Sequence, residues 1–141
     1  MGLVVDSTVF VGAERKNQTV VALLEALQQR FGDEEIVVSA LSAGELLHGV
    51  WRASTPVIRA ARQQFVEEVF VRTWVRNVNL NTARIAAQID AQARAKGKVI
   101  PATDLWIGST ALELGFSLVS ANFRHFKMIP GLKTTAFPHK R

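Results

Sequence analysis

The chain has no cysteine among its 141 residues. Disulfide bonds, thiolate zinc sites and cysteine nucleophiles are therefore excluded, and nothing in the composition favours secretion. No apolar run approaches the roughly 20 residues that a membrane-spanning helix needs, and the N-terminal segment lacks the basic leader and cleavage site of an exported protein. We therefore expect a cytoplasmic protein that is not inserted into a membrane.

Length and charge narrow the class of protein further. A chain of 141 residues fits one domain, so we expect a single domain over 1–141. Apolar residues make up 48% and charged residues 21%, which is typical of a globular protein. The formal net charge of +5 favours polyanionic partners, because lysine and arginine release counterions when they bind phosphates. Charge alone indicates nucleic acid only weakly, since many basic proteins bind none.

Short apolar segments alternate with helical patterns along the chain. We expect buried strands at 3–5, 36–38, 74–78 and 117–120, with the third the most ambiguous. Apolar spacing, capping residues and glycine stops predict helices at 7–13, 17–30, 42–53, from 55 onward, 82–96 and 103–114. The tail from 130 is expected to be a loop or one edge strand. This alternation predicts an α/β fold with three α/β/α layers around a mainly parallel sheet.

Three carboxylates are predicted near the carboxyl ends of these strands. Asp6 directly follows the first strand, Glu45 is expected in the first turn of the helix after the second, and Asp104 opens the helix before the last. Ligands collect at this edge of an open parallel sheet. Magnesium and manganese prefer such oxygen ligands, and a cation bound there activates water for attack on a phosphodiester. The three histidines, His48, His125 and His139, show no zinc-ligand spacing.

Each acid also has a purely structural interpretation. Ser42 and Glu45 have the spacing of a capping box, in which the glutamate only stabilises the start of the helix. Asp104 follows Thr103 and suits the first turn of a helix because of the helix dipole. Asp6 is harder to explain in this way, since a carboxylate after a buried strand is costly unless it is hydrogen-bonded or bound to a metal.

Four segments of the chain resemble the signature blocks of the VapC toxins of the PIN-domain family. They are VVDSTVFV (4–11), LSAGELLHG (41–49), PATDLWIGSTAL (101–112) and VSANFRHF (119–126). The blocks come in the family's order, and the resemblance spans residues 3 to about 132. It implies a PIN-like fold and a metal-dependent endoribonuclease that hydrolyses RNA with metal-activated water.

The resemblance also implies roles for individual residues. The metal-binding and catalytic acids fall on Asp6, Glu45 and Asp104, and Mg²⁺ or Mn²⁺ is the implied cofactor. The family's fourth polar position, often an aspartate, falls on Asn122, which adds no charge and leaves the occupancy of a second metal open. Groups expected to orient a carboxylate, a water or the substrate are Ser7, Thr8, Ser120 and Arg124. Turn and cap roles remain the alternative for the three hydroxyls.

Partners follow from the same resemblance. It implies RNA as substrate, a VapB-like antitoxin whose C-terminal segment packs into a groove of the toxin and blocks the acidic site, and a homodimer or a toxin–antitoxin hetero-oligomer. Apolar stretches at 20–27 and 57–71 are candidate contact surfaces or simply core. Two groups of basic residues are candidates for a phosphate path, although most helix charges are only solvated; they are Arg59, Arg62, Arg72 and Arg76, and Arg94, Lys96 and Lys98.

Two other functions compete with this interpretation. The chain could be a non-catalytic RNA-binding or scaffold protein, with Asn122 marking a weakened site. It could also be a phosphatase, because an aspartate after the first strand suits that chemistry, but the expected Asp-x-Asp is absent: Asp6 is followed by Ser7 and Thr8. Trp51, Trp74 and Trp106 are expected mainly in the core, although aromatic rings also stack on unpaired bases.

Overall fold

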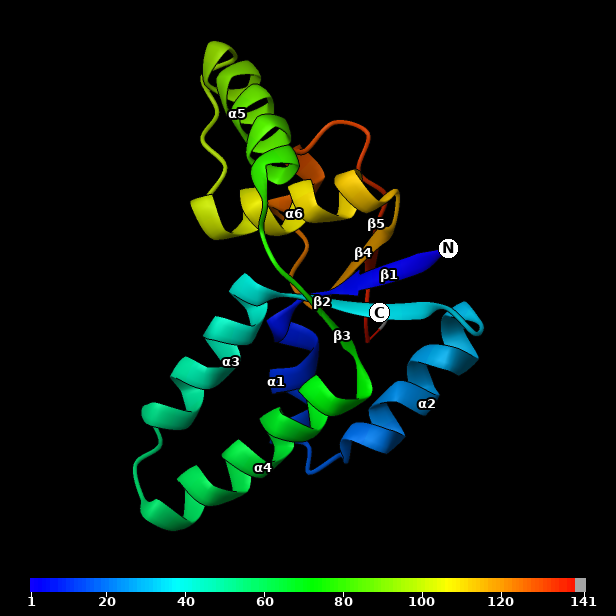
Figure 1. The fold of residues 1–141 in the computed structure, drawn as a ribbon, viewed down its shortest axis with the longest axis vertical. Helices are drawn as coiled ribbons and strands as arrows, with labels where there is room; N and C mark the ends of the chain where they lie inside the picture. The colour runs from blue at the N-terminus through cyan, green and yellow to red at the C-terminus, as the bar shows by residue number, and fades with distance from the viewer. Residues whose placement is uncertain (139–141) are drawn as a thin grey trace.

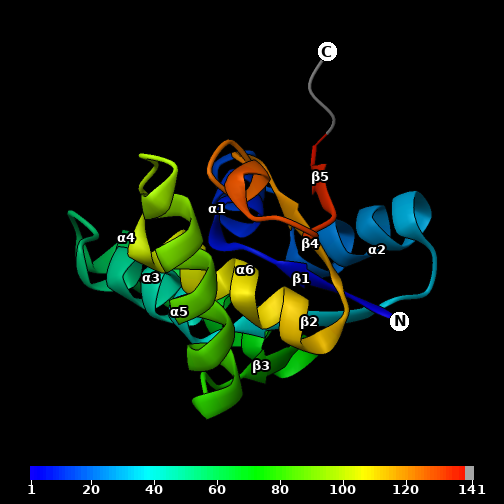
Figure 2. The ribbon, with the colours of Figure 1, turned by 90° about the horizontal axis from the view of Figure 1, so that it is seen from above.

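Five strands form one parallel sheet in the computed structural model, which describes residues 1–138 (Figure 1). The spatial order is β3-β2-β1-β4-β5, and all four neighbouring pairs run parallel. The strands are β1 (Gly2–Val5), β2 (Glu35–Ser39), β3 (Trp74–Arg76), β4 (Ser117–Ser120) and β5 (Thr134–Ala136). The predicted parallel sheet is confirmed. Figure 2 shows β3 and β5 at its opposite edges, so the tail supplies an edge strand.

Helices connect the strands throughout the described residues. The α-helices are α1 (Ser7–Arg15), α2 (Val20–Phe31), α3 (Ala40–Trp51), α4 (Pro56–Arg72), α5 (Leu80–Ala95) and α6 (Ala102–Leu114), and the 3-10 helix is η1 (Phe126–Met128). The predicted helices are present, but α2 begins later than predicted and α3 and α5 begin earlier. Their starts are set by the side chains of Thr19, Ser39 and Asn79, which accept backbone N–H groups of the first turn. Over residues 1–138, no helix is long and apolar enough to cross a membrane.

The two faces of the sheet are covered by different helices. Successive side chains of a strand point to opposite faces, so Leu3 and Val5 of β1 pack with helices α1 to α4, whereas Val4 packs with α5 and α6. Figure 1 shows the same division, with α5 and α6 above the sheet and the other helices below it. The predicted three-layer α/β/α architecture is confirmed.

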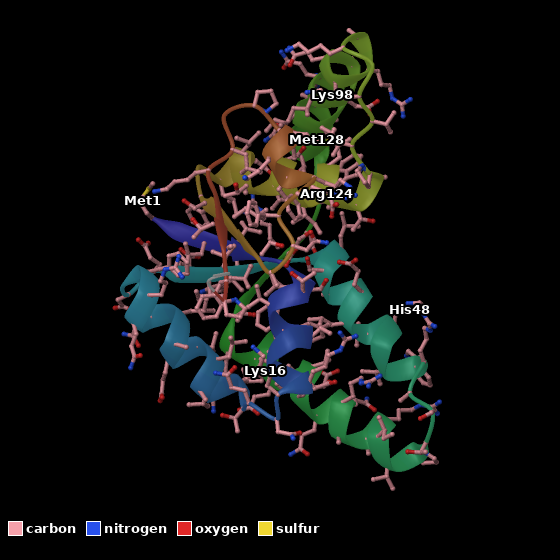
Figure 3. All side chains as sticks on the ribbon, turned by 180° about the vertical axis from the view of Figure 1, so that it is seen from behind. Met1, Lys16, His48, Lys98, Arg124 and Met128 are labelled. Atoms are coloured by element: carbon pink, nitrogen blue, oxygen red, sulfur yellow. The ribbon has the colours of Figure 1, made fainter. Side chains whose placement is uncertain are left out.

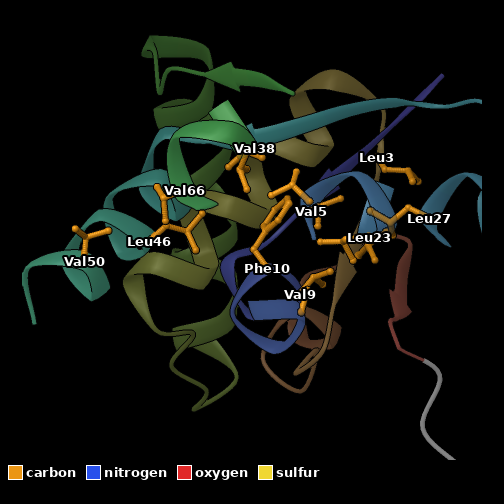
Figure 4. Packing of buried hydrophobic residues seen from close by; sticks show 14 residues of the cluster. Leu3, Val5, Val9, Phe10, Leu23, Leu27, Val38, Leu46, Val50 and Val66 are labelled. Atoms are coloured by element: carbon orange, nitrogen blue, oxygen red, sulfur yellow. The ribbon is translucent and has the colours of Figure 1, made fainter. Parts of the chain in front are cut away.

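The core on the α1 to α4 side is built from branched aliphatic residues around one aromatic ring. Phe10 of α1 is fully buried, and Leu23 and Leu27 of α2 pack beside it (Figure 4). Helix α4 contributes Val66 to this core, whereas other apolar residues of the same helix are exposed on its opposite face. Burial of these side chains fixes α1 and α3 against the carboxyl edge of the sheet, which is where the predicted acids lie.

The other face depends on a close approach at Gly108 of α6. A Cβ atom at this position would overlap Cδ1 of Ile129, which is itself buried. Glycine therefore lets the segment after η1 pack directly against α6. This contact brings the turn that follows β4 close to the start of α6.

A partly buried ion pair joins β3, α5 and α6. The Glu113 carboxylate, 10% exposed, accepts a hydrogen bond from the Thr82 hydroxyl at 2.6 Å and one from Nη2 of Arg76 at 3.3 Å. Thr82 also belongs to the capping box of α5 with Asn79. The start of α5 is thus tied to the end of α6 by charge-assisted hydrogen bonds.

Candidate active site

The order in which successive strands are added to the sheet reverses at its centre. From β1 the chain proceeds outward through β2 and β3, and it then returns to place β4 and β5 on the other side of β1. In open parallel sheets, such a switch point opens a crevice beyond the carboxyl ends of the two strands. Asp6 follows β1 and Ser120 ends β4, so both lie at this point.

Asp6 is buried, with 4% of its surface exposed, and is held by three hydrogen bonds. The Thr8 backbone N–H and hydroxyl both donate to Oδ1, and the Ser120 hydroxyl donates to Oδ2 at 2.8 Å. The backbone bond makes Asp6 the N-cap of α1. The buried carboxylate is therefore satisfied by protein donors, which also fix its orientation.

The two hydroxyls that hold Asp6 are themselves fixed by the backbone after β4. Thr8 Oγ1 accepts from the Ala121 N–H at 3.0 Å, and Ser120 Oγ accepts from the Asn122 N–H at 2.9 Å. The loop after β4 thus locks the environment of the first acid.

Glu45 lies in the second turn of α3 rather than the first. The prediction of a Ser42–Glu45 capping box is wrong, because the N-cap is Ser39, whose hydroxyl accepts from the Leu41 N–H at 3.2 Å. The carboxylate of Glu45 instead accepts a hydrogen bond from the Ser7 hydroxyl at 3.0 Å, across 38 positions of sequence. Glu45 therefore faces α1 and Asp6, and it does not cap the start of α3.

Asp104 stands in the first turn of α6, as predicted. Its Oδ2 lies 2.9 Å from Nδ1 of His125, in the turn after β4. This contact was not predicted, because His125 lies 21 positions from Asp104 and reaches it only through the packing of that turn on α6. No local sequence pattern indicates such a contact.

The three acids lie close enough for their charges to interact in pairs. Burial raises the pKa of Asp6 to about 6, although hydrogen bonds from Thr8 and Ser120 lower it, and the charge of Glu45 contributes to the rise. Burial also raises the pKa of Glu45, and the charge of Asp104 adds to this effect against the hydrogen bond from Ser7. Repulsion therefore links Asp6 to Glu45 and Glu45 to Asp104.

This cluster has the chemistry that a hard divalent cation requires. Its donors are carboxylate oxygens, and a cation among them would relieve the repulsion that raises the pKa values of Asp6 and Glu45. Within residues 1–138, no three His, Cys, Asp or Glu side chains are arranged to hold a metal ion together. One or two carboxylates with water in the remaining positions is a common magnesium arrangement, so the donor set fits such an ion.

Asn122 and Arg124 lie in the turn between β4 and η1. Asn122 is exposed and contributes its backbone N–H to Ser120. Arg124, labelled in Figure 3, is also exposed, and its Nη2 lies 3.2 Å from Nε2 of His125. The turn therefore touches Asp6 through Ser120 and Asp104 through His125.

The first group of basic residues is engaged in internal contacts. Each arginine has a partner: the Trp51 ring and carbonyl for Arg59, Glu14 for Arg62, Glu68 for Arg72 and Glu113 for Arg76. In the second group Arg94 pairs with Asp90, and Lys98 lies near the far end of α5 (Figure 3). Arg62 of the first group nevertheless lines the same cleft as Glu45.

The expectation that tryptophans serve the core is wrong for two of the three. Trp51 is 70% exposed and Trp74 69% exposed, while Trp106 is partly buried against the α5 and α6 side of the core. Trp51 ends α3, and Trp74 lies in β3 at the edge of the sheet, where fewer neighbours can cover a large ring. His139 lies outside the described residues.

A groove of about 530 Å³ begins at Glu45 and runs between α1, α3 and α4. Its walls combine apolar and basic side chains, among them Phe10, Leu46, Arg15 and Arg52. Glu45 thus forms a border between the acidic cluster and a surface large enough to hold an extended segment of another molecule.

Comparison with known proteins agrees with this architecture. The family model of the PIN domain matches residues 3–132. Ribonuclease VapC19 of Mycobacterium tuberculosis is 31% identical over 129 residues, which are 92% of this chain and 95% of that protein. Among solved structures, a chain of VapBC2 from Rickettsia felis bound to a promoter DNA fragment has a TM-score of 0.84 and 21% identity, covering 97% of this chain and 99% of its own. A chain of DNA-bound VapBC from Salmonella typhimurium has a TM-score of 0.80 and 20% identity, covering 96% and 98%. These two structures share the fold.

Proposed function

This chain belongs to the PIN-domain family, within the VapC ribonucleases of toxin–antitoxin systems, and from that premise we propose that its acidic cluster cleaves RNA with Mg²⁺ or Mn²⁺. One observation carries the proposal: Asp6, Glu45 and Asp104 come from three separate elements and meet at the switch point of the sheet, where Ser7 binds Glu45, Ser120 binds Asp6 and His125 binds Asp104. A fold has no structural need to gather like charges there, and perturbed carboxylates in a cleft are typical of catalytic sites.

We assign separate roles to the polar residues of this site. We assign the cation to Asp6, Glu45 and Asp104, with one or two of these carboxylates binding it directly and the rest through water. When bound, the cation would supply an activated water for attack and charge to stabilise the leaving oxygen. Thr8 and Ser120 orient the Asp6 carboxylate through their hydroxyls.

The remaining polar side chains orient a carboxylate or contact the RNA substrate. Ser7 orients Glu45 through its hydroxyl. Asn122 and Arg124, exposed in the turn after β4, are placed to meet the phosphate backbone of the RNA from the other side of the crevice.

Cleavage of labelled RNA by the purified chain tests this function. Wild type should yield discrete fragments with Mg²⁺ or Mn²⁺ and none with chelator, and Asp104→Asn should lose at least about 100-fold in rate because an essential charge is removed. Asp90→Asn makes the matched control, since Asp90 pairs with Arg94 on the surface of α5. RNA binding without cleavage by folded wild type under every metal condition would instead establish a non-catalytic RNA-binding protein.

A VapB-type antitoxin is the partner we propose for the groove beside Glu45. Relatives crystallised as VapBC complexes support a partner of this kind, and an occupant of the groove would lie against Glu45. In the cytoplasm, where we place this chain, production of wild type should arrest growth and co-production of the cognate antitoxin should restore it. Arg52→Glu, in the groove wall, should weaken that rescue, whereas equal rescue would remove the groove from the interface.

A further inference from the structure

His125 lies between the carboxylate of Asp104 and the guanidinium of Arg124. Its Nδ1 is 2.9 Å from Oδ2 of Asp104, and its Nε2 is 3.2 Å from Nη2 of Arg124. The side chains of His125 and Asp104 are only 30% and 28% exposed. A chain of hydrogen bonds thus runs from the turn after β4 to the first turn of α6.

The chemistry of the three groups determines the direction of these hydrogen bonds. A guanidinium has donors and no acceptor, so Nε2 of His125 must accept from Arg124. A neutral imidazole carries its hydrogen on the other nitrogen in that case, and Nδ1 therefore donates to Asp104. Arg124 selects the tautomer that His125 needs in order to hold the carboxylate.

We propose that His125, kept in this tautomer by Arg124, is a positioning residue that fixes the rotation of the Asp104 carboxylate for a divalent cation. The hydrogen bond occupies Oδ2, and within residues 1–138 no hydrogen bond engages Oδ1, which stays available as a ligand. Hydrogen bonds from neighbouring groups commonly orient metal-binding carboxylates in this way. The inference rests on the proposed function, which places Asp104 among the metal ligands.

A competing role for His125 predicts the opposite change in Mn²⁺ affinity. If His125 merely competed with the cation for Asp104, its removal would strengthen metal binding. As a positioning residue, it prevents the carboxylate from turning away, and its removal weakens binding. The sign of the change in Mn²⁺ affinity therefore separates the two roles without any measurement of RNA cleavage.

The test is a titration of the purified chain with Mn²⁺, in the absence of RNA, with free Mn²⁺ followed by electron paramagnetic resonance. His125→Ala should weaken binding by about tenfold or more, which is the usual cost of losing a group that orients a ligand. His125→Asn should restore most of the affinity, because its amide nitrogen occupies the place of Nδ1. Lys127→Ala serves as the control, since it removes an exposed side chain from the same region with no hydrogen bond to Asp104.

The role of Arg124 has its own signature in the same assay. Arg124→Ala should weaken Mn²⁺ binding in the wild-type background, because Asp104 alone then selects the tautomer. In the His125→Asn background the same substitution should not weaken binding, since asparagine has no atom in the place of Nε2 that could accept from Arg124. Equal effects in both backgrounds would overturn the coupling of Arg124 through His125.

Further outcomes separate this inference from the proposed function. Unchanged or tighter binding by His125→Ala, beside weak binding by Asp104→Asn, would overturn the positioning role and leave the metal site intact. Absence of Mn²⁺ binding by wild type would overturn both. If His125→Ala fails to fold, His125→Gln replaces it: its longer side chain places the amide near the Nε2 position, so it should bind more weakly than His125→Asn, and equal affinities would refute the role.

Discussion

Asp6 should destabilise the metal-free protein when it is ionised. Burial raises its pKa from 3.8 to about 6, which corresponds to about 3 kcal/mol of preference for the neutral carboxyl in the folded state. Replacement by asparagine removes this cost, but the asparagine NH2 cannot accept from the Ser120 hydroxyl, and this mismatch offsets about 1 to 2 kcal/mol. We therefore expect Asp6→Asn to be more stable than wild type at pH 7.5 in chelator by about 1 to 2 kcal/mol.

The pH dependence of this difference is the sharper quantity. A pKa that is higher in the folded state gives stability that is fully present below pH 3.8 and is lost as the pH rises through about 6. Wild type should therefore gain about 2 kcal/mol relative to Asp6→Asn between pH 7.5 and pH 4.5, because protonation occurs mainly in the folded chain. The hydrogen-bond cost is common to both pH values and cancels.

Urea unfolding followed by tryptophan fluorescence measures both free energies. Wild type, Asp6→Asn and the control Asp33→Asn, which removes an exposed carboxylate before β2, are compared at the two pH values in chelator. The control should remain within about 0.5 kcal/mol of wild type at each pH, as is usual for exposed positions. A difference between wild type and Asp6→Asn that is the same at pH 7.5 and 4.5 would refute the claim that the folded state raises the pKa of Asp6.

Three other perturbations test separate parts of the structure. Ser120→Ala should raise the pKa of Asp6 above its wild-type value, because it removes a hydrogen bond to the charged form; carboxyl NMR titration in chelator would detect this, and an unchanged pKa would contradict it. Burial alone would raise the pKa of Glu113, but hydrogen bonds, above all the one from Thr82, lower the pKa overall. The ionised Glu113 therefore stabilises the folded state above its ordinary pKa of 4.5, and this stabilisation is lost at lower pH. Glu113→Gln should therefore cost about 1 to 3 kcal/mol in urea unfolding at pH 7 and less at pH 3.5. Gly108→Ala should lower the free energy of unfolding by about 1 to 3 kcal/mol because the buried Ile129 side chain must move to admit a Cβ, and unchanged stability would show that the neighbouring side chains adjust freely.

The order of the elements could be predicted because each strand has a strong local signal. Runs such as 3–5 and 117–120 are short, apolar and bounded by turns, and their alternation with helices leaves few topologies open. Helix starts were less predictable, since the chain offers serines at both 39 and 42. Only Ser39, the last residue of β2, has the extended backbone that an N-cap needs, and α3 therefore begins earlier than the Ser42–Glu45 pattern indicated.

The candidate site divides in a similar way. Asp6, Glu45 and Asp104 could be proposed as a group because the ends of parallel strands meet at one edge of a sheet. Their hydrogen-bond partners depend on packing between distant segments, as in the contact of His125 with Asp104. No periodicity or spacing encodes such a contact. The exposure of Trp74 was likewise not predictable, because it depends on β3 being the outermost strand.

The turn after β4 supplies hydrogen-bond donors to the site where the family resemblance leads one to expect a further charge. Ser120, at the end of β4, donates to Asp6, and Nδ1 of His125 donates to Asp104, while Asn122 between them is uncharged. A fourth carboxylate here would add repulsion to a cluster in which Asp6 already has its pKa raised to about 6. An amide avoids this cost, and with three carboxylates a single divalent cation compensates most of the charge. We therefore expect Asn122→Asp to bind a second Mn²⁺ more readily than wild type does. Without metal, the added carboxylate should raise the pKa values of the neighbouring acids. Unchanged Mn²⁺ stoichiometry and unchanged pKa values would mean that position 122 is too far from the three acids to affect them electrostatically.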